Sequence, residues 1–515
     1  MNKKQIAIIG TGVAGLTACK HCLSKGFNPI VFELESQVGG VWTKTIRTTR
    51  LQAPKDMYQF SDFPWPTSVT DTFPTQQQVL DYIRSYATHF NLIPHIHFNS
   101  RVKGISYDGP YSNTWSMWNG TGEPFPSQGK WNVTVENTPT ATTKVYRVDF
   151  VILCLGRFKD VPNIPQFPLG KGPEVFQGHA MHSMKYSAMD NHKAAEFVKG
   201  KKVVVVGFGK TGLDIARECA SVNGPEHPCT IVYRRDHWKL GNWFPWGIPV
   251  SNFIFSRFRE LLVHKPGEGF LLSLVATLLS PISWVIWKLL EIYIKTSLQL
   301  AKFDMVPQHS ITQDLHSGLV MYLPNPKNFV DTIENGSIKL KKSSSFSFYD
   351  KGVLITKDNT KIEADIVIFA TGFNGKKKLK DIFESPTFGH LIESSSRVGL
   401  YRECIPPRIP QVAVVGFSDG VSSLFVSEST SRWVTGLLEG KFKLPSIVDM
   451  EKDITRWDEY MKQVSGECHH LSTLCGAEIW YNDQICKDMG VSPMRKKSLI
   501  SNLFQPYGSS DYVEK

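Results

Sequence analysis

Residues 5–15 read Gln-Ile-Ala-Ile-Ile-Gly-Thr-Gly-Val-Ala-Gly, a short apolar run that ends in glycines with the spacing GxGxxG. The apolar run predicts a buried strand, and the residues that follow predict a helix. Gly10 allows a tight turn, Gly12 lets backbone approach a pyrophosphate, and Gly15 lets the helix pack on the strand. The free N–H groups at the helix N-terminus then attract phosphate. The stretch therefore predicts the first unit of a doubly wound dinucleotide-binding domain.

A second apolar run follows at the distance that a βαβ unit requires. It reads Pro-Ile-Val-Phe-Glu over residues 29–33 and ends in Glu33. A carboxylate about 20 residues after the glycines can accept hydrogen bonds from ribose hydroxyls. Just beyond, Gly39-Gly40-Val41-Trp42 predicts a further close approach to the cofactor, with Gly40 and Trp42 as contacts. A glycine turn without function is the alternative, and the strand, helix and carboxylate together argue against it.

The same strand–glycine turn–helix pattern recurs about 200 residues later. Valines 203–206 are followed by Gly207-Phe208-Gly209-Lys210-Thr211-Gly212, which lacks the spacing of a Walker A loop. We expect Gly207, Gly209, Thr211 and Gly212 to contact a second dinucleotide.

The strand after this second turn ends differently from the first. Residues 230–233 are followed by Arg234 and Arg235 in place of an acid. An acid would repel a 2′-phosphate, whereas a guanidinium pairs with it. The sequence therefore predicts NADPH in preference to NADH, read by Arg234 or Arg235. A surface arginine pair without a ligand is the alternative.

Two more apolar runs, at residues 150–156 and 365–372, end in small residues. Both are apolar without alternation, which is typical of buried parallel strands. We expect an α/β fold of two doubly wound, Rossmann-like dinucleotide-binding domains, with the NADPH domain inserted into the first. The expected boundaries are 1–165 for the first part of the first domain, 166–330 for the inserted domain, and 331–515 for the returning part and C-terminal tail.

The composition is that of an ordinary globular protein: 515 residues, 41% hydrophobic, with a net charge of +11. A basic surface favours anionic ligands such as NADPH, an acidic membrane or nucleic acid, but the sequence contains no nucleic-acid-binding motif. The nine cysteines are scattered, and Cys19 and Cys22 form a CxxC without a second pair. We expect a reducing, cytoplasmic environment, no disulfide framework and no metal site.

Residues 270–287 form 18 consecutive positions without a charge. This length is at the lower limit for spanning a bilayer, and Pro281 interrupts the run. We therefore expect a hydrophobic helical insertion at about 245–300, formed by a buried or membrane-touching pair of helices rather than a true span. Peripheral contact with a membrane, at the surface of the endoplasmic reticulum, is compatible with such a segment.

Residues 176–186 read Phe-Gln-Gly-His-Ala-Met-His-Ser-Met-Lys-Tyr and match FxGxxxHxxx[YFW] through Phe176, Gly178, His182 and Tyr186. This pattern identifies the flavin-containing monooxygenases, and the chain resembles their plant branch over nearly its whole length. The other stretches that carry the resemblance are GFGKTGLDIA at 207–216, ATGF at 370–373 with Thr371 and Gly372, LQAPKDMYQFSDFPWP at 51–66, and the tail PYGSSDY at 506–512.

The resemblance implies FAD in the first domain and NADPH in the second. In this family, reduced flavin reacts with molecular oxygen to give a C4a-hydroperoxide, which transfers one oxygen atom to a nitrogen or sulfur nucleophile. The substrate class is then a small amine, amino acid or thioether. Relatives in this branch include amino-acid N-hydroxylases, among them a defence-related enzyme acting on pipecolic acid, which favours N-hydroxylation.

The resemblance also assigns roles to two residues. Many members of the family carry an asparagine beside the flavin where this chain has Gln52, which offers the same amide on a longer arm. Gln52 is therefore the candidate catalytic residue. Because the cofactor performs the difficult chemistry, His182 is interpreted as a positioning residue rather than a general base.

Two alternatives remain open. A Baeyer–Villiger ketone monooxygenase shares the fold, but its fingerprint usually ends in tryptophan rather than Tyr186. A redox-inactive flavoprotein that serves as a binding module is the second. A disulfide reductase is excluded, because it requires a CxxxxC pair and no cysteine occurs between Cys22 and Cys154.

Overall fold

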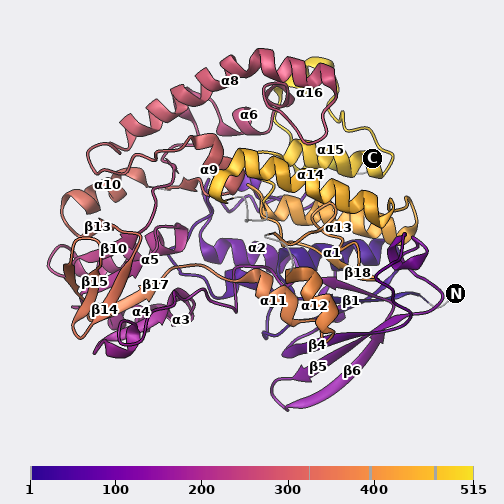
Figure 1. Ribbon diagram of the computed structural model, residues 1–515, viewed down its shortest axis with the longest axis horizontal. Helices are drawn as coiled ribbons and strands as arrows, with labels where there is room; N and C mark the ends of the chain where they lie inside the picture. Colours follow the sequence, from indigo (N-terminus) through magenta and orange to yellow (C-terminus); the bar gives the residue numbers. More distant parts are fainter. Residues whose placement is uncertain (1–2, 324, 394–396, 469–472, 514–515) are drawn as a thin grey trace.

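The computed structural model describes residues 3–323, 325–393, 397–468 and 473–513. Two α/β units lie side by side, and a long helix, α8 (Phe270–Ser297), crosses the top of the molecule (Figure 1). Each unit is built on a five-stranded sheet. The expected fold of two doubly wound dinucleotide-binding domains is therefore confirmed.

The first unit contains a parallel sheet in the order β18-β7-β1-β2-β3. Its last strand in the sequence, β18, comes from near the C-terminus and pairs with β7, with Val412 opposite Val151. The chain therefore leaves this unit and returns to it, as expected. The strands are β1 (Gln5–Ile9), β2 (Asn28–Phe32), β3 (Ile96–His97), β7 (Phe150–Leu153) and β18 (Val412–Val414).

The second unit contains a parallel sheet in the order β13-β10-β9-β17-β8. Its strands are β8 (His179–His182), β9 (Val203–Val206), β10 (Cys229–Tyr233), β13 (Ile338–Lys342) and β17 (Ile366–Phe369). An antiparallel sheet of β14 (Phe346–Tyr349), β15 (Gly352–Ile355) and β16 (Thr360–Glu363) lies between β13 and β17 in the sequence.

The boundary expected at residue 330 is too early. Both β13 and β17 follow it, yet they pair with β10 and β9 of the second sheet. The second unit therefore extends to about Phe369. A strand buried on both faces, such as β17, reads as a continuous apolar run. Such a run does not indicate which of two parallel sheets it joins.

Helices cover both sheets, and a three-stranded antiparallel sheet packs on the first unit (Figure 1). In that small sheet the strands are β4 (Ser100–Asp108), β5 (Lys130–Asn137) and β6 (Thr142–Val148), and a short parallel pair is formed by β11 (Lys239–Leu240) and β12 (Met321–Tyr322). The helices besides α8 are α1 (Val13–Ser24), α2 (Gln76–His89), α3 (Ser183–Ser187), α4 (Asn191–Val198), α5 (Lys210–Asn223), α6 (Val250–Ile254), α7 (Arg257–Leu261), α9 (Ile311–Ser317), α10 (Pro326–Glu334), α11 (Gly375–Asp381), α12 (Pro386–Glu393), α13 (Ser423–Glu439), α14 (Ile447–Ser465), α15 (Glu478–Asp488) and α16 (Leu499–Phe504).

The hydrophobic insertion is present, but its apolar run forms one long helix instead of the expected pair. α8 runs for 28 residues with Pro281 inside it. Its buried side chains, including Trp287, Leu290 and Ile294, lie on the side that packs on the second unit. Most of its other apolar side chains are exposed. α8 is also the one helix in the described residues that is long and apolar enough to cross a membrane.

Candidate active site

The first glycine turn requires glycine at two of its three positions. Gly10 has φ +106°, a conformation that residues with a Cβ rarely adopt, and a Cβ there would lie 2.5 Å from the Cys154 carbonyl oxygen. A Cβ at Gly15 would overlap the carbonyl oxygen of Gly10. These two glycines therefore allow β1, α1 and the end of β7 to meet, as expected for their positions.

Gly12 differs, because the fold itself does not require a glycine there. Its φ is −67°, and a Cβ would contact only the Gly40 Cα, at 3.6 Å. Gly12 is also the N-cap of α1 and provides no side-chain cap for the helix N–H groups. Gly40, at φ +58°, faces it so closely that a Cβ there would lie 2.8 Å from the Gly12 Cα. The space before the helix N-terminus is thus free for a phosphate.

Glu33 lies beside this turn, and Trp42 follows Gly40 in the segment that approaches Gly12. The buried carboxylate of Glu33 accepts hydrogen bonds from the Thr11 backbone N–H at 2.8 Å and from the Thr11 hydroxyl at 2.6 Å. Its other oxygen accepts one from the Glu35 N–H at 2.9 Å. Trp42 is half-buried, and its indole N–H donates to the Tyr58 hydroxyl at 3.3 Å. The carboxylate is therefore fixed next to the glycines before any ligand binds.

The second glycine turn repeats the first almost position by position. Gly207 has φ +116°, and a Cβ there would lie 2.5 Å from the Ala370 carbonyl oxygen. A Cβ at Gly212 would overlap the Gly207 carbonyl oxygen, whereas one at Gly209 would meet nothing within 4 Å. Thr211 is exposed in the first turn of α5. The second unit therefore offers the same open helix N-terminus as the first.

The two arginines after β10 differ in their surroundings. Both side chains are exposed. Arg235 forms an ion pair with Glu467, whereas Arg234 has no ion-pair partner among the residues that the structure describes. Arg234 is therefore the arginine available to an anionic ligand.

The fingerprint residue His182 has both ring nitrogens engaged. Nδ1 accepts a hydrogen bond from the Met184 N–H at 3.2 Å, so the proton of the neutral ring is on Nε2, which donates to the Gly372 carbonyl oxygen at 3.0 Å. Burial lowers the pKa of His182 below its usual value, although the hydrogen bond to Gly372 acts in the opposite direction. A neutral imidazole bonded on both sides fits a positioning role better than that of a general base.

The other fingerprint residues pack β8 within the second unit. A Cβ at Gly178 would overlap the Phe176 ring and the Asp365 carbonyl oxygen, so the phenyl ring lies directly on the glycine. Tyr186 is buried in the core of this unit. The pattern thus describes how the strand that carries His182 is held in place.

His182 holds the crossing between the two units. The Gly372 carbonyl oxygen that it bonds also accepts the Asn163 N–H at 2.9 Å, and the Thr371 hydroxyl donates to the Asn163 carbonyl oxygen. On the same ladder the Asn374 N–H donates to the Val161 carbonyl oxygen at 2.7 Å. The outgoing and returning connections therefore pair in antiparallel fashion. Thr371 and Gly372 lie in this crossing.

Gln52 lies where the first unit contacts the second. Its backbone carbonyl accepts the indole N–H of Trp243 at 2.9 Å, and its side-chain oxygen accepts the Tyr322 N–H at 3.3 Å. The amide nitrogen makes no hydrogen bond within the described chain. Nearby, the Thr49 hydroxyl donates to Asp214 of α5 at 2.7 Å. The contacts from Trp243, Tyr322 and Asp214 carried no signal in the sequence, because all three lie far from residue 52 along the chain.

Comparisons with known proteins agree with this geometry. The model of the family described as flavin-binding monooxygenase-like matches residues 3–504. The chain is 38% identical to the probable flavin-containing monooxygenase 1 of Arabidopsis thaliana, over 99% of this chain and 96% of the relative. It is 36% identical to the putative flavin-containing monooxygenase 2 of the same plant, over 95% and 98%. Its fold resembles that of OTEMO in a crystal structure with FAD and NADP, with a TM-score of 0.65 and 16% identity over 94% and 97% of the two chains.

Proposed function

The chain belongs to the flavin-binding monooxygenase-like family, and we propose that it transfers one oxygen atom from O2 to the nitrogen of a small amine or amino acid. Membership in the family makes it a flavoprotein that uses FAD, NADPH and O2. The flavin supplies the redox chemistry when bound. The protein's own residues bind the two nucleotides and position them.

The pair of open helix N-termini supports the two nucleotide cofactors that this reaction uses. Gly12 and Gly209 each leave room for a phosphate at a position where the fold would accept a larger residue. Each helix N-terminus presents backbone N–H donors to an anion. In the second unit, Arg234 adds a free guanidinium for a 2′-phosphate. These groups fit FAD in the first unit and NADPH in the second.

Oxygen transfer to nitrogen is favoured over ketone oxidation by the polar group at the contact between the units. Gln52 is neutral, and its amide nitrogen is free to donate a hydrogen bond. A neutral donor suits transfer to an electron-rich nitrogen, whereas attack on a ketone needs an anionic oxidant held by a cation. In addition, the fingerprint ends in Tyr186 where Baeyer–Villiger enzymes usually have tryptophan.

A substrate screen tests the proposed reaction. Purified protein with FAD bound would be given NADPH and, separately, amino acids, amines, thioethers and a cyclic ketone, while NADPH oxidation, O2 uptake and product mass are followed. We expect a product one oxygen atom heavier, hydroxylated on nitrogen. Turnover of thioethers alone or conversion of the ketone to a lactone would contradict nitrogen transfer. A yellow protein that oxidises no NADPH would be a binding module.

Gln52 is expected to couple NADPH oxidation to oxygen transfer. In Gln52→Ala, we expect the ratio of hydrogen peroxide to product to rise by about fivefold, the effect of losing one hydrogen bond worth ~1 kcal/mol. The FAD content should stay constant, since the side chain contacts Tyr322 and not the glycine turn. Peroxide and product assays on the same sample measure the ratio. Gln52→Asn retains the amide and should restore part of the coupling; unchanged coupling in the alanine variant would remove Gln52 from the mechanism.

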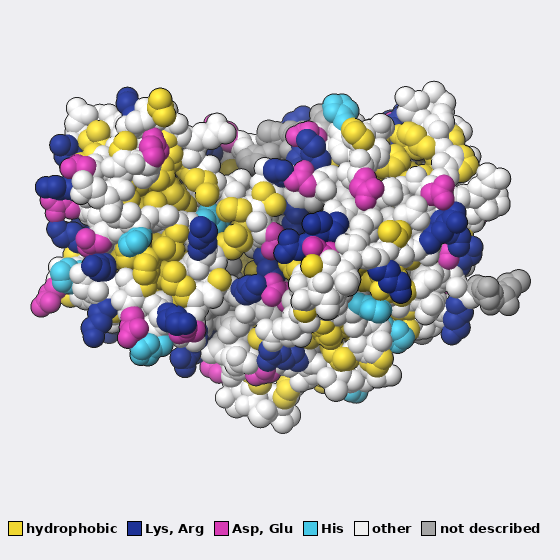
Figure 2. Space-filling view, turned by 90° about the horizontal axis from the view of Figure 1, so that it is seen from below, with side chains coloured by type: hydrophobic (Ala, Val, Ile, Leu, Met, Phe, Trp, Pro, Cys, Tyr) yellow, Lys and Arg dark blue, Asp and Glu magenta, His cyan; other side chains and the backbone are white. Residues whose placement is uncertain are grey.

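We further propose that α8 lies on a lipid bilayer as a peripheral anchor, which would place the enzyme at a cytoplasmic membrane surface such as that of the endoplasmic reticulum. Most of its exposed side chains are apolar, including Leu271, Leu278 and Trp284. The nearby α16 exposes Leu499 and Ile500 on the same upper side (Figure 1). The opposite face carries acidic and basic side chains interspersed with apolar ones (Figure 2).

Packing and charge favour a lipid bilayer as the surface that covers these apolar side chains. The C-terminal part of α8 is buried against the second unit through residues such as Leu290 and Ile294, whereas Ala276 is the one buried residue between 270 and 286. A long apolar helix held to the protein at one end, with an exposed tryptophan, is suited to the membrane interface. The net charge of +11 favours an anionic lipid surface. The arrangement favours lying on the membrane over crossing it.

The double variant Leu271→Glu with Leu278→Glu tests this anchor. The two side chains are 75% and 68% exposed, so their replacement should leave the fold intact. Burying each leucine in lipid is worth up to about 2 kcal/mol, so vesicle binding should weaken by well over tenfold. Co-sedimentation with vesicles of phosphatidylcholine and phosphatidylserine measures it. Leu169→Glu, at a site that is 98% exposed elsewhere, is the control. Concentration-dependent dimerisation without vesicle binding would identify a second copy as the occupant instead.

A further inference from the structure

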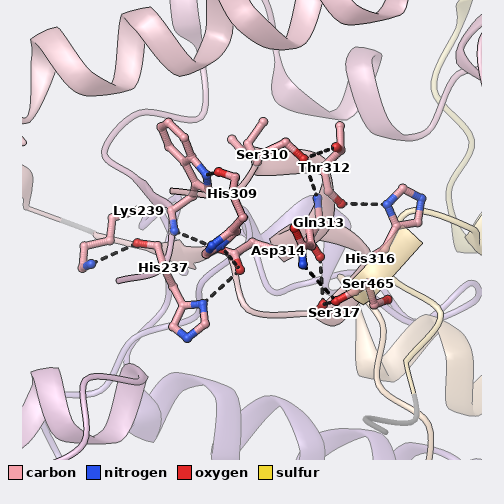
Figure 3. Close-up of polar contacts among 12 residues, drawn as sticks. His237, Lys239, His309, Ser310, Thr312, Gln313, Asp314, His316, Ser317 and Ser465 are labelled. Carbon is pink, nitrogen blue, oxygen red and sulfur yellow. Dashed lines mark hydrogen bonds and ion pairs between the residues drawn. The ribbon is translucent and has the colours of Figure 1, made fainter. Parts of the chain in front are cut away.

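Three potential metal ligands meet between β10 and α9. His237 lies in the segment between β10 and β11, and His309 and Asp314 lie on either side of Ser310, the N-cap of α9. One ligand atom from each of the three residues lies within 4.8 Å of the others. Among the residues that the structure describes, this is the one group of its kind. Figure 3 shows the three side chains converging.

The imidazole rings of His237 and His309 both contact the same carboxylate oxygen of Asp314. Nδ1 of His237 lies 2.9 Å from the Asp314 Oδ1, and Nε2 of His309 lies 2.8 Å from that oxygen. The other carboxylate oxygen is occupied, because it accepts the Trp238 backbone N–H at 2.7 Å. Oδ1 therefore faces two ring nitrogens at separations close to those between neighbouring ligands of a small cation.

His309 is not satisfied by this contact. Its Nε2 is buried and has no hydrogen-bond partner, although the Asp314 oxygen is 2.8 Å away. This nitrogen is therefore in ion-pair contact with the carboxylate without meeting hydrogen-bond criteria, and a cation bound by both atoms would coordinate it.

The three side chains are held in place by neighbouring groups. The Trp238 indole N–H donates to the His309 carbonyl oxygen at 2.9 Å, and the buried Lys239 ammonium donates to the His237 carbonyl oxygen at 3.0 Å. Asp314 is nearly fully buried, while the His237 and His309 side chains remain 20% and 25% exposed. The ligands are thus preorganised, and both imidazole side chains are partly exposed.

We propose that His237, His309 and Asp314 form a binding site for a divalent first-row transition metal ion. Two imidazole nitrogens and one carboxylate oxygen are a common protein donor set for Zn²⁺ and Fe²⁺, with water filling the open positions. The ion would connect the segment after β10 to the start of α9. It would also lie in the chain segment that follows Arg234 and Arg235. Lys239, which bonds to His237, also lies 4.3 Å from the Phe208 ring of the second glycine turn, so the site lies beside the NADPH-binding unit. The metal proposal does not rest on the proposed reaction, because metal binding is measured directly.

Zinc binding to the flavin-loaded, chelator-treated protein tests the proposal. Competition with a chromophoric chelator should give about one equivalent of Zn²⁺, and binding should raise the midpoint of thermal unfolding by mass action. His237→Gln and His309→Gln should each weaken binding by about 100-fold or more, since even partners beyond the ligands contribute roughly 10–100-fold. His264→Gln is the matched control, because His264 contacts the carboxylate of Glu268 without a third ligand.

Cobalt binding to the unaltered protein provides a readout that does not depend on how the variants fold. Co²⁺ in this donor set should give visible d–d bands without an intense thiolate charge-transfer band. A thiolate band would place the metal on one of the nine cysteines and would overturn the proposal. So would stoichiometric zinc binding that both glutamine variants retain, or the absence of zinc binding to the unaltered protein at micromolar concentrations.

Discussion

Gly12→Ala should give a folded protein that purifies almost without FAD. The added methyl group would meet only the Gly40 Cα, at 3.6 Å, an ordinary van der Waals contact, and the φ of −67° suits any residue. The fold therefore has no reason to reject alanine. The methyl group would instead occupy the space before the N-terminus of α1, where the pyrophosphate is expected to approach the backbone.

The expected loss of FAD affinity is about 100-fold or more, which corresponds to ~2.8 kcal/mol. Flavin absorbance per mole of protein and titration of the apoprotein with FAD measure it, and circular dichroism verifies the fold. Gly15→Ala is the contrasting variant, because its Cβ would overlap the Gly10 carbonyl oxygen and should prevent folding altogether. If Gly12→Ala bound FAD as tightly as the unaltered protein, the cofactor site would have to be sought elsewhere.

Arg234→Ala should remove most of the preference for NADPH over NADH. Arg234 is exposed at the end of β10 and has no ion-pair partner in the described chain, so its loss should not disturb the structure. A charge-assisted hydrogen bond to a 2′-phosphate contributes about 1.5–3 kcal/mol. The KM for NADPH should therefore rise by roughly 10–100-fold, while the KM for NADH changes little.

Steady-state kinetics with both nucleotides measure this difference. Arg235→Ala is the matched control, because Arg235 is already paired with Glu467 and should matter less. Glu467→Gln would free Arg235 and should lower the KM for NADPH if that arginine also reaches the phosphate. Equal increases in the KM for NADPH and NADH in Arg234→Ala would show that Arg234 does not bind the 2′-phosphate.

The sequence predicted the features that depend on residues close together along the chain. The strand–turn–helix units at Gly10 and Gly207, and the return of the chain to the first sheet, follow from apolar runs and glycine spacing. The motif also gave Gly10, Gly12 and Gly15 different roles, and the surroundings of each Cα agree with them, since a Cβ is excluded at Gly10 and Gly15 but not at Gly12.

The errors and omissions concern long-range relationships. The predicted boundary at residue 330 was wrong because the sequence of a wholly apolar strand such as β17 does not indicate which of the two sheets it joins. The apolar run around Pro281 suggested two helices, yet the proline stands inside one. The group of His237, His309 and Asp314 was not found, since it joins two segments separated by the entire length of α8. No spacing rule connects such residues.

The paired crossing between the units has a consequence for how this protein can change over evolutionary time. Because Val161 and Asn374 lie opposite each other on one ladder, the second unit is inserted through two ends that are hydrogen-bonded neighbours. Because its two ends are adjacent, the second unit can be replaced by a homologous unit without changing the distance between the chain ends of the first unit. Recombination between relatives could therefore exchange the whole second unit and its nucleotide preference. The new unit would also have to supply the histidine equivalent to His182, which bonds to the crossing.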